Sequence, residues 1–138
     1  MKLSELVSDI ESDEAFEVYY GGPVATDTLH YIHNVGNLLE DSVKVAQGAY
    51  WGGDFDKLKF LISSKMILKE NIRFYIGYSG WTSGQLENEL TFGSWILSDL
   101  YSNYIFKSKA STLWQQAIRN KGNAYSVIAQ IPNYISFN

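Results

Sequence analysis

The chain has 138 residues, of which 46% are apolar and 19% are charged, a mix typical of one globular domain. Because the chain contains no cysteine, disulfides, thiol catalysis and thiolate metal sites are excluded. The first residues lack the apolar stretch of a signal peptide, and no apolar run approaches the roughly 20 residues of a membrane span.

The net charge of −4 is unevenly distributed along the chain. Residues 1–20 contain one lysine and six acidic residues, whereas residues 57–73 contain five basic residues and one acidic residue. We expect the basic segment to be a solvated helix face and the loop after it, because a nucleic-acid-binding domain usually shows a broader basic footprint. Nucleic-acid contact through residues 57–73 is kept as a minor alternative.

The N-terminal half is predicted to contain a helix followed by three strands. Helical spacing of apolar residues predicts the helix over 3–11. Alternating apolar residues predict strands over 15–20, 26–34 and 41–51. Gly48 marks an expected bulge in the third of these strands.

The middle of the chain is predicted to begin with a helix and a strand. The helix spans 52–65, where Asp54 is the expected N-cap and the apolar residues fall on one stripe. The strand spans 71–78, with apolar side chains on one face.

A capping box predicts the start of the next helix, over residues 82–90. Thr82 and Gln85 fit the T-x-x-Q pattern, in which each side chain bonds a free backbone N–H of the other residue. The run SWILSDL at residues 94–100 predicts a further strand, whereas residues 102–107 fit either a helix or a strand.

Two helices are predicted at the C-terminal end, over 111–122 and 123–131, with Gly122 as the left-handed stop of the first. Strands and helices are therefore intermixed, and glycines separate adjacent strands. This order indicates a single-domain α+β fold with a mixed or antiparallel sheet.

The stretch RFYIGYSGWTSGQLENEL, residues 73–90, has the strand–glycine–helix order of many nucleophile and phosphate loops. A nucleophile elbow needs G-x-S-x-G, but Trp81 replaces the second glycine of the frame around Ser79. The sequence also contains no Walker A loop and no G-x-G-x-x-G. We therefore expect the glycine pairs at 21–22 and 52–53 to be tight turns at strand ends.

The two histidines, His30 and His33, raise the question of a metal site. In a strand, residues three apart point to opposite faces, so these two cannot chelate one ion. The acidic pairs at 40–41 and 54–56 lack a convincing acid/base partner. The sequence therefore predicts no metal site, no cofactor and no catalytic residue.

Arg73 and Trp81 are the most informative side chains of the glycine-rich stretch. Arg73 is expected on the face of its strand opposite the apolar one, where Glu87 or Glu89 could pair with it. The alternative is that Arg73 lines a cleft with Trp81 and Gln85 and holds an anionic ligand. Trp81 is expected by default to be a lid on the core, and in this alternative it is the wall of a pocket.

Four blocks of the sequence, in this order, resemble the YqgE/AlgH family, also called UPF0301. They are VYYGGPV, GAYWGGDFDKLKFLI, RFYIGYSGWTSGQLENEL with GSWIL soon after, and TLWQQAIRNKG. The resemblance covers nearly the whole chain. The sequence is similar to family members from Bacteroidetes-type bacteria. Where the family usually has Gly-Pro, this chain has Thr82-Ser83, a change that keeps the helix start.

The resemblance implies a bacterial, cytosolic protein with a single YqgE/AlgH-like domain over residues 1–138, in which a bent sheet closes into a pseudo-barrel with helices packed outside. The family typically begins with additional strands, so we expect this chain to be N-terminally truncated or a short variant. Missing strands would leave an open sheet edge, which favours a homodimer. One branch of the family has been called a transcriptional regulator, but no helix-turn-helix or β-ribbon signature supports DNA reading here.

Together these features favour a non-enzymatic binding or regulatory module without a membrane partner. It would take a small molecule or a partner protein through three loops that converge at one end of the sheet. The candidate binding residues are Gly21, Gly22, Pro23, Gly52, Gly53, Asp54, Arg73, Tyr78, Gly80, Trp81, Gln85 and Glu87. The alternative is an enzyme of unrecognised type acting on an anionic or nucleotide-like substrate, with Arg73 binding the anion and Glu87, Asp54 or a histidine as base.

Overall fold

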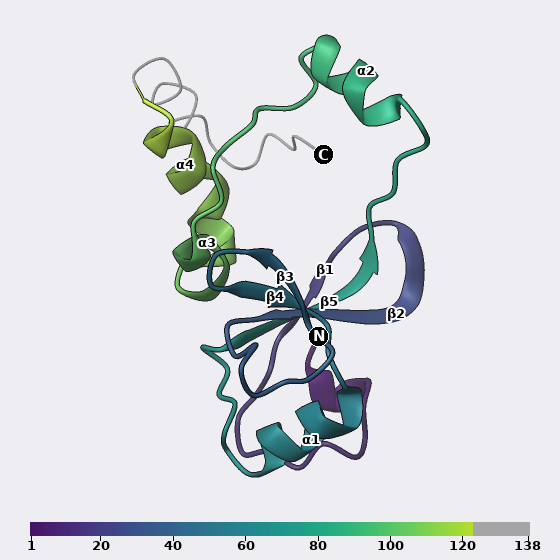
Figure 1. The fold of residues 1–138 in the computed structure, drawn as a ribbon, viewed down its shortest axis with the longest axis vertical. Helices are drawn as coiled ribbons and strands as arrows, with labels where there is room; N and C mark the ends of the chain where they lie inside the picture. Colours follow the sequence, from purple (N-terminus) through teal and green to yellow (C-terminus); the bar gives the residue numbers. More distant parts are fainter. Residues whose placement is uncertain (123–138) are drawn as a thin grey trace.

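The computed structural model describes residues 1–122, in which one five-stranded sheet carries the helices (Figure 1). The strands are β1 (Val18–Tyr20), β2 (Val24–His33), β3 (Val43–Ala46), β4 (Ala49–Trp51) and β5 (Ile72–Tyr78). The helical elements are the 3-10 helix η1 (Leu3–Glu5) and the helices α1 (Phe55–Ser63), α2 (Gln85–Thr91), α3 (Ser102–Phe106) and α4 (Ala110–Asn120).

The sheet is mixed and open. Its strand order is β1-β5-β2-β4-β3, with β1 parallel to β5 and the other pairs antiparallel. The predicted single-domain α+β class is confirmed. Because β1 and β3 are the two edges of this sheet, it does not close into the barrel that the family resemblance implied.

The core lies between the sheet and α1. Leu58, Leu61 and Ile62 form the apolar stripe of α1 and are buried with Phe74 of β5 and Tyr31 of β2. Burying each such side chain contributes about 1.5–3 kcal/mol. This end of the molecule, with α1 below the sheet in Figure 1, therefore fixes the positions of β2 and β5.

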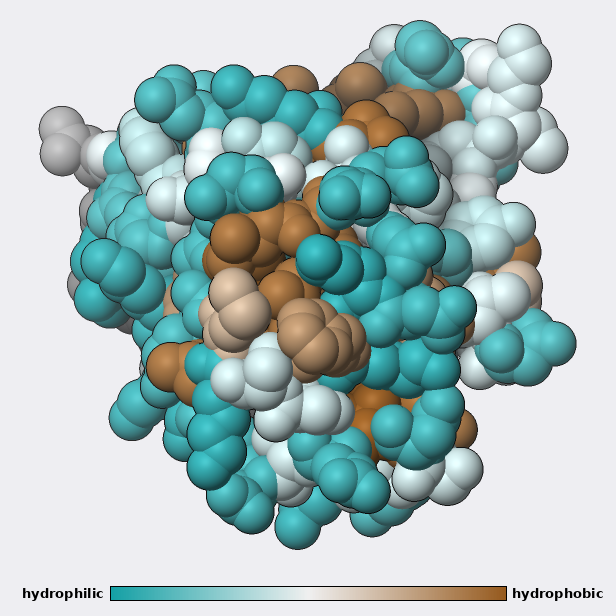
Figure 2. All heavy atoms as spheres, turned by 60° about the horizontal axis from the view of Figure 1, so that its bottom comes forward, coloured by the Kyte–Doolittle hydropathy of each residue, from teal (hydrophilic) through white to brown (hydrophobic). Residues whose placement is uncertain are grey.

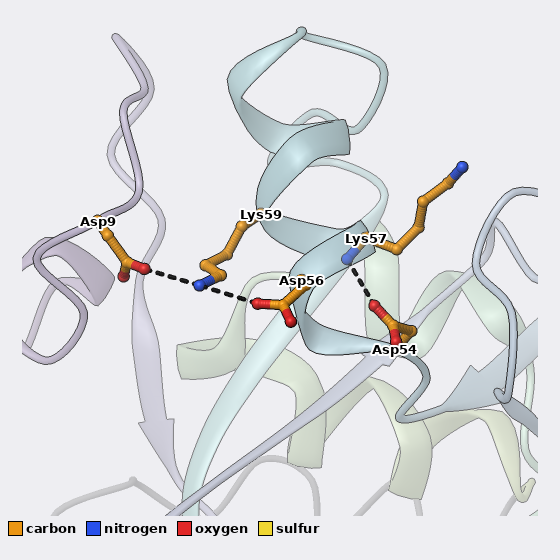
Figure 3. Close-up of polar contacts among 5 residues, drawn as sticks. All are labelled: Asp9, Asp54, Asp56, Lys57 and Lys59. Carbon is orange, nitrogen blue, oxygen red and sulfur yellow. Dashed lines mark hydrogen bonds and ion pairs between the residues drawn. The ribbon is translucent and has the colours of Figure 1, made fainter.

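Asp54 caps α1, as predicted. Its Oδ1 accepts the backbone N–H of Lys57 at 2.7 Å (Figure 3). An N-cap carboxylate satisfies one of the free N–H groups at a helix start. The role of Asp54 in the structure is thus to begin α1.

Two predictions for the N-terminal half are wrong. The helix expected over 3–11 is reduced to η1, because the Leu3 backbone N–H donates to the Phe16 carbonyl and the segment turns away after Leu6. The strand expected over 41–51 is the hairpin β3–β4. Gly48 adopts a left-handed φ of 73° in the turn of this hairpin, and the pairing of β3 with β4 is irregular between Lys44 and Ala46, close to the expected bulge.

Residues 79–101 also depart from prediction. The run at 94–100 has no strand partner in the described part of the chain, so it is not a strand. α2 begins at Gln85, whose Oε1 accepts the Thr82 backbone N–H at 3.0 Å, but the Thr82 hydroxyl does not complete the capping box. Figure 1 shows α2 set away from the sheet, and none of its residues is buried.

The C-terminal helices match the prediction where they are described. Of residues 102–107, which fitted either type, Ser102–Phe106 form α3, and α4 covers most of the helix predicted over 111–122. Gly122 has the expected left-handed φ of 111°. The helix predicted over 123–131 lies outside the described residues.

The acidic N-terminal segment covers the basic segment at 57–73. The Lys59 ammonium lies 2.7 Å from the Asp9 carboxylate and 3.1 Å from Asp56 (Figure 3), and Lys65 lies 2.9 Å from Asp13. The Glu14 carboxylate accepts the Lys69 backbone N–H at 2.8 Å. The pairing of Lys59 and Lys65 offsets part of the positive charge of this segment.

The surface at the α1 end is mostly polar. Figure 2 shows small groups of apolar side chains separated by hydrophilic ones on this side of the molecule. Exposed apolar residues of α1 and the segment after it are Phe60, Met66 and Leu68. Within residues 1–122, no helix is both long enough and apolar enough to cross a membrane.

Candidate functional site

Two of the three predicted glycine loops meet at one end of the sheet. The Gly21 backbone N–H donates to the Ile76 carbonyl at 2.9 Å, and the Ser79 hydroxyl reaches the Gly21 carbonyl at 3.4 Å. A β-carbon on Gly21 would clash with the Gly77 carbonyl, and one on Gly22 would clash with the Tyr78 backbone. Only glycine permits this approach of two backbones.

Gly77 changes the direction of the side chain that follows it. Its φ of 67° is left-handed, and the pairing of β5 with β2 is irregular between Val24 and Leu29. In a regular strand, Tyr75 and Tyr78 would point to opposite faces. The irregular backbone instead lets both rings line the same surface hollow.

This hollow, here called the aromatic hollow, has a volume of about 630 Å³. Its main walls are the side chains of Tyr20, His30, Ile32, Trp51, Tyr75 and Tyr78. The walls come from β1, β2, β4 and β5, which are four adjacent strands of the sheet. Ligand sites in proteins commonly have this size and are lined in the same way, by aromatic and apolar groups with few polar ones.

His30 is the central polar group of the aromatic hollow. Its ring stacks on Trp51 with centroids 6.1 Å apart and contacts the edge of Tyr78 at 5.8 Å. The Thr28 hydroxyl lies 2.7 Å from the Ala25 carbonyl and 3.0 Å from His30 Nε2. A hydroxyl has one hydrogen, which goes to the carbonyl, so Thr28 accepts from His30 Nε2–H. In the neutral ring, Nδ1 is then a hydrogen-bond acceptor.

Tyr75 supplies a hydroxyl at the wall of the hollow. Burial raises the pKa of this hydroxyl, although the nearby Arg73 guanidinium opposes the shift. Tyr75 therefore keeps its proton at neutral pH and can donate a hydrogen bond.

The third predicted loop, at 52–54, does not join the other two. The Gly52 carbonyl bonds to His33 Nε2 at 2.8 Å, the Gly53 carbonyl accepts from the Tyr31 hydroxyl, and Asp54 caps α1. These contacts lie beside α1 and the core. Of the three loops predicted to converge, at 21–24, 52–54 and 78–85, the structure brings the first into contact with only the start of the third. The loop at 52–54 lies elsewhere.

Trp81 and Gln85 belong to a separate cluster around the Glu89 carboxylate. Glu89 accepts from the indole N–H groups of Trp95 at 2.6 Å and Trp81 at 3.2 Å, and from the Gln85 amide at 2.8 Å. These bonds, the one from Trp95 foremost, hold the pKa of Glu89 below its usual value. The side chain of Glu87 is exposed and is not part of this cluster.

Arg73 lies neither in the predicted ion pair with a glutamate nor in the predicted cleft with Trp81. Its guanidinium donates to three backbone carbonyls, those of Lys69, Ile72 and Phe106. No ion pair joins it to Glu87 or Glu89 within the described chain, and it does not share a cleft with Trp81 and Gln85.

Of the remaining candidates, Gly22 is buried in the loop contact, and Gly80 lies next to Tyr78 and Val24. Pro23, which follows Gly22 in the chain, is exposed. Sequence reasoning missed the walls Tyr20, His30, Trp51 and Tyr75. The alternation of His30 and Ile32 could have shown that these two side chains share one face of β2. The sequence did not show that Trp51 lies beside Ile32, because that pairing depends on the β3–β4 hairpin.

Comparison with known proteins identifies the group to which this sheet and its glycine loops belong. An AlgH-like family model matches residues 1–126. The chain belongs to the AlgH-like family. A UPF0301 protein from Chlorobium limicola is 37% identical over 137 residues, which are 99% of this chain and 73% of that protein. A UPF0301 protein from Cytophaga hutchinsonii is 40% identical over 128 residues, covering 91% and 70%.

Two solved structures have a similar fold. The AlgH protein from Pseudomonas aeruginosa matches with a TM-score of 0.65 and 25% identity, over 96% of this chain and 73% of that one. A protein from Corynebacterium diphtheriae matches with a TM-score of 0.65 at 19% identity, over 94% and 67% of the two chains. The family and its fold are therefore established for this chain, and the aromatic hollow lies in the matched region.

Proposed function

We propose that this AlgH-like protein is a non-enzymatic binding module whose aromatic hollow takes a small molecule with a flat ring. The observation that supports the proposal is the hollow itself, of about 630 Å³ and walled by His30, Trp51, Tyr75 and Tyr78. Aromatic side chains favour stacked and edge-on contacts with another ring, each worth about 0.5–1.5 kcal/mol beyond area burial. The four rings come from adjacent strands of one sheet, so their backbones are positioned by strand pairing before a ligand arrives.

The polar groups of the hollow narrow the class of ligand. His30 Nδ1 is an acceptor in the neutral ring, and the hydroxyl of Tyr75 is a donor. A ring that carries both an N–H or O–H group and an acceptor would satisfy both. We therefore expect uncharged heteroaromatic compounds to bind more tightly than plain aromatic hydrocarbons.

A thermal-shift screen of small heteroaromatic compounds tests the proposal, with two tryptophan variants as a matched pair. Trp51 is 45% exposed and lines the hollow, whereas Trp81 is 42% exposed and lies in the Glu89 cluster. A compound at ~100 times its Kd stabilises by about 2.7 kcal/mol. We expect that gain to vanish in Trp51→Ala and to persist in Trp81→Ala.

The opposite pattern, loss in Trp81→Ala and retention in Trp51→Ala, would place the ligand in the Glu89 cluster and contradict the proposal. An absence of stabilising compounds in the wild type would also contradict it. Trp51→Phe, which keeps a ring at the wall, should restore most of the binding if Trp51→Ala loses it.

A partner protein is the second candidate ligand, favoured by exposed apolar side chains. Phe92 is 85% exposed and Leu97 is 66% exposed in the segment 79–101. Val43 and Val45 are exposed on the edge strand β3, where a second copy of the chain could pair. If that edge forms a homodimer, Val45→Lys should convert it to a monomer in sedimentation, and a wild type that is monomeric at all concentrations would exclude it.

A further inference from the structure

A second hollow of about 480 Å³ lies between the sheet and the helices α3 and α4. Its walls are largely apolar and include Leu100, Ile105, Leu113 and Ala117. Arg73 of β5 also lines it, and so does Asp99. Tyr20 and Tyr75 stand between this hollow and the aromatic hollow, because they line both. An apolar cavity with one guanidinium is suited to a ligand with an apolar body and one anionic group.

The guanidinium of Arg73 is fixed in position by backbone carbonyls. Nη1 donates to the Lys69 carbonyl at 2.8 Å and to the Ile72 carbonyl at 3.0 Å, and Nη2 donates to the Phe106 carbonyl at 2.8 Å. These carbonyls come from the loop before β5, from β5 itself and from α3. Because three elements hold the group, little side-chain entropy is lost when a ligand binds to it.

Three bonds leave two of the five N–H groups of Arg73 available. A guanidinium carries one N–H on Nε and two on each Nη, so the remaining groups are on Nε and Nη2. Free N–H donors on Nε and Nη2 can bond the oxygens of a carboxylate and form a charge-assisted pair with it.

The charge of Arg73 is not neutralised within the described chain. Carbonyl oxygens satisfy its hydrogen bonds but carry no net charge, and no carboxylate of residues 1–122 lies within ion-pair distance. A half-buried cation beside apolar walls gains free energy from an anionic partner. Asp99 adds a negative charge to the same hollow, which disfavours ligands with more than one.

We propose that the hollow between the sheet and α3–α4 binds an amphipathic monocarboxylate, with the carboxylate on Nε and Nη2 of Arg73 and the hydrocarbon part among the side chains of α3 and α4. This site is distinct from the aromatic hollow. It does not depend on the function proposed for that hollow.

Octanoate and octanol, titrated separately into the full chain by calorimetry, test this proposal. The two probes share a hydrocarbon chain and differ in the charged head. We expect octanoate to bind more tightly than octanol by roughly tenfold to a hundredfold, the range for a charge-assisted hydrogen bond. The Arg73 Nε–H signal in the ¹H–¹⁵N spectrum should shift with octanoate and not with octanol. Equal affinities, or no binding of octanoate, would overturn the proposal.

Three variants locate the site. Ala117→Phe fills the hollow from α4 without altering the hydrogen bonds of Arg73, and it should abolish binding in a folded protein. Asp99→Asn removes the opposing charge and should tighten octanoate binding while leaving octanol unchanged. Trp51→Ala, in the aromatic hollow, should leave octanoate binding intact. Loss of binding in Trp51→Ala with retention in Ala117→Phe would place octanoate in the aromatic hollow and overturn the assignment.

Discussion

The imidazole of His33 holds the carbonyl of Gly52, with Nε2 2.8 Å from the carbonyl oxygen, and so ties β2 to the loop that starts α1. Nδ1 accepts the Val35 backbone N–H at 3.3 Å, which requires the proton of the neutral ring to be on Nε2. His33 is fully buried, and Tyr50 stacks on its ring. The side chain is therefore a structural link within the core.

The free energy of unfolding should decrease when the pH falls below the pKa of an ordinary histidine. Burial lowers the pKa of His33 from its usual 6.5, and the bond to Gly52 opposes this only in part. Because the folded-state pKa is the lower one, the unfolded chain takes up the proton first. Stability is then complete above pH 6.5 and decreases as the pH falls through the folded-state pKa. Urea denaturation at a series of pH values measures this decrease.

His33→Gln should remove that decrease and cost about 1–3 kcal/mol at neutral pH, because the buried Gly52 carbonyl loses its partner. His30→Gln is the matched control, since His30 lies in the aromatic hollow and not in the core. If His33→Gln kept the full decrease below pH 6.5, the buried imidazole would not be its source.

Removing the N-cap of α1 should destabilise the protein. Asp54→Ala leaves the Lys57 N–H without its acceptor and should cost about 1 kcal/mol, whereas Asp54→Asn should cost less. Asp56→Ala is the control, because the Asp56 side chain is 91% exposed and its pair with Lys59 should contribute little. Equal losses in Asp54→Ala and Asp56→Ala by thermal denaturation would show that charge, and not capping, is the cause.

Because the two glycine loops are in contact, alanine substitutions at Gly77 and Gly80 should differ in their cost to stability. Gly77→Ala forces a left-handed φ of 67° on alanine and drives a β-carbon into the Gly22 carbonyl. Strain of this kind costs on the order of 1–3 kcal/mol. Gly80→Ala should be nearly neutral, since its added β-carbon would have its nearest neighbour at 3.7 Å. A tolerated Gly77→Ala, with an unchanged melting temperature, would contradict the close approach.

The ion pair between the N-terminal segment and α1 should be visible in carboxyl titrations. The hydrogen bond from Lys59 lowers the pKa of Asp9 below 3.8, so Lys59→Met should raise that pKa toward 3.8. Asp13 serves as an internal control, because its pKa is lowered by Lys65 and should not respond to Lys59→Met. Carbon-13 NMR of the carboxyl groups measures both titrations, and an Asp9 signal unmoved by the substitution would rule out the pair.

Several features of the protein were determined by local sequence. The apolar stripe and the N-cap of α1 follow from residues 54–62, and the strand β5 follows from alternation over 72–78. Such elements are predictable because the periodicity that forms them also provides the face they bury. The intermixed order of strands and helices was enough for the α+β class.

Tertiary structure decided which residues share a site. Tyr20, His30, Trp51 and Tyr75 lie together only because β1 pairs with β5, β5 with β2, and β2 with β4. The same pairing separates Trp81 from Arg73, which local order in the sequence had suggested as neighbours. Residues 94–100 have a strand-like pattern but do not form a strand. Such a pattern forms a strand only where another strand supplies its hydrogen bonds. Strand register depends on contacts between distant residues, so one local sequence cannot specify it.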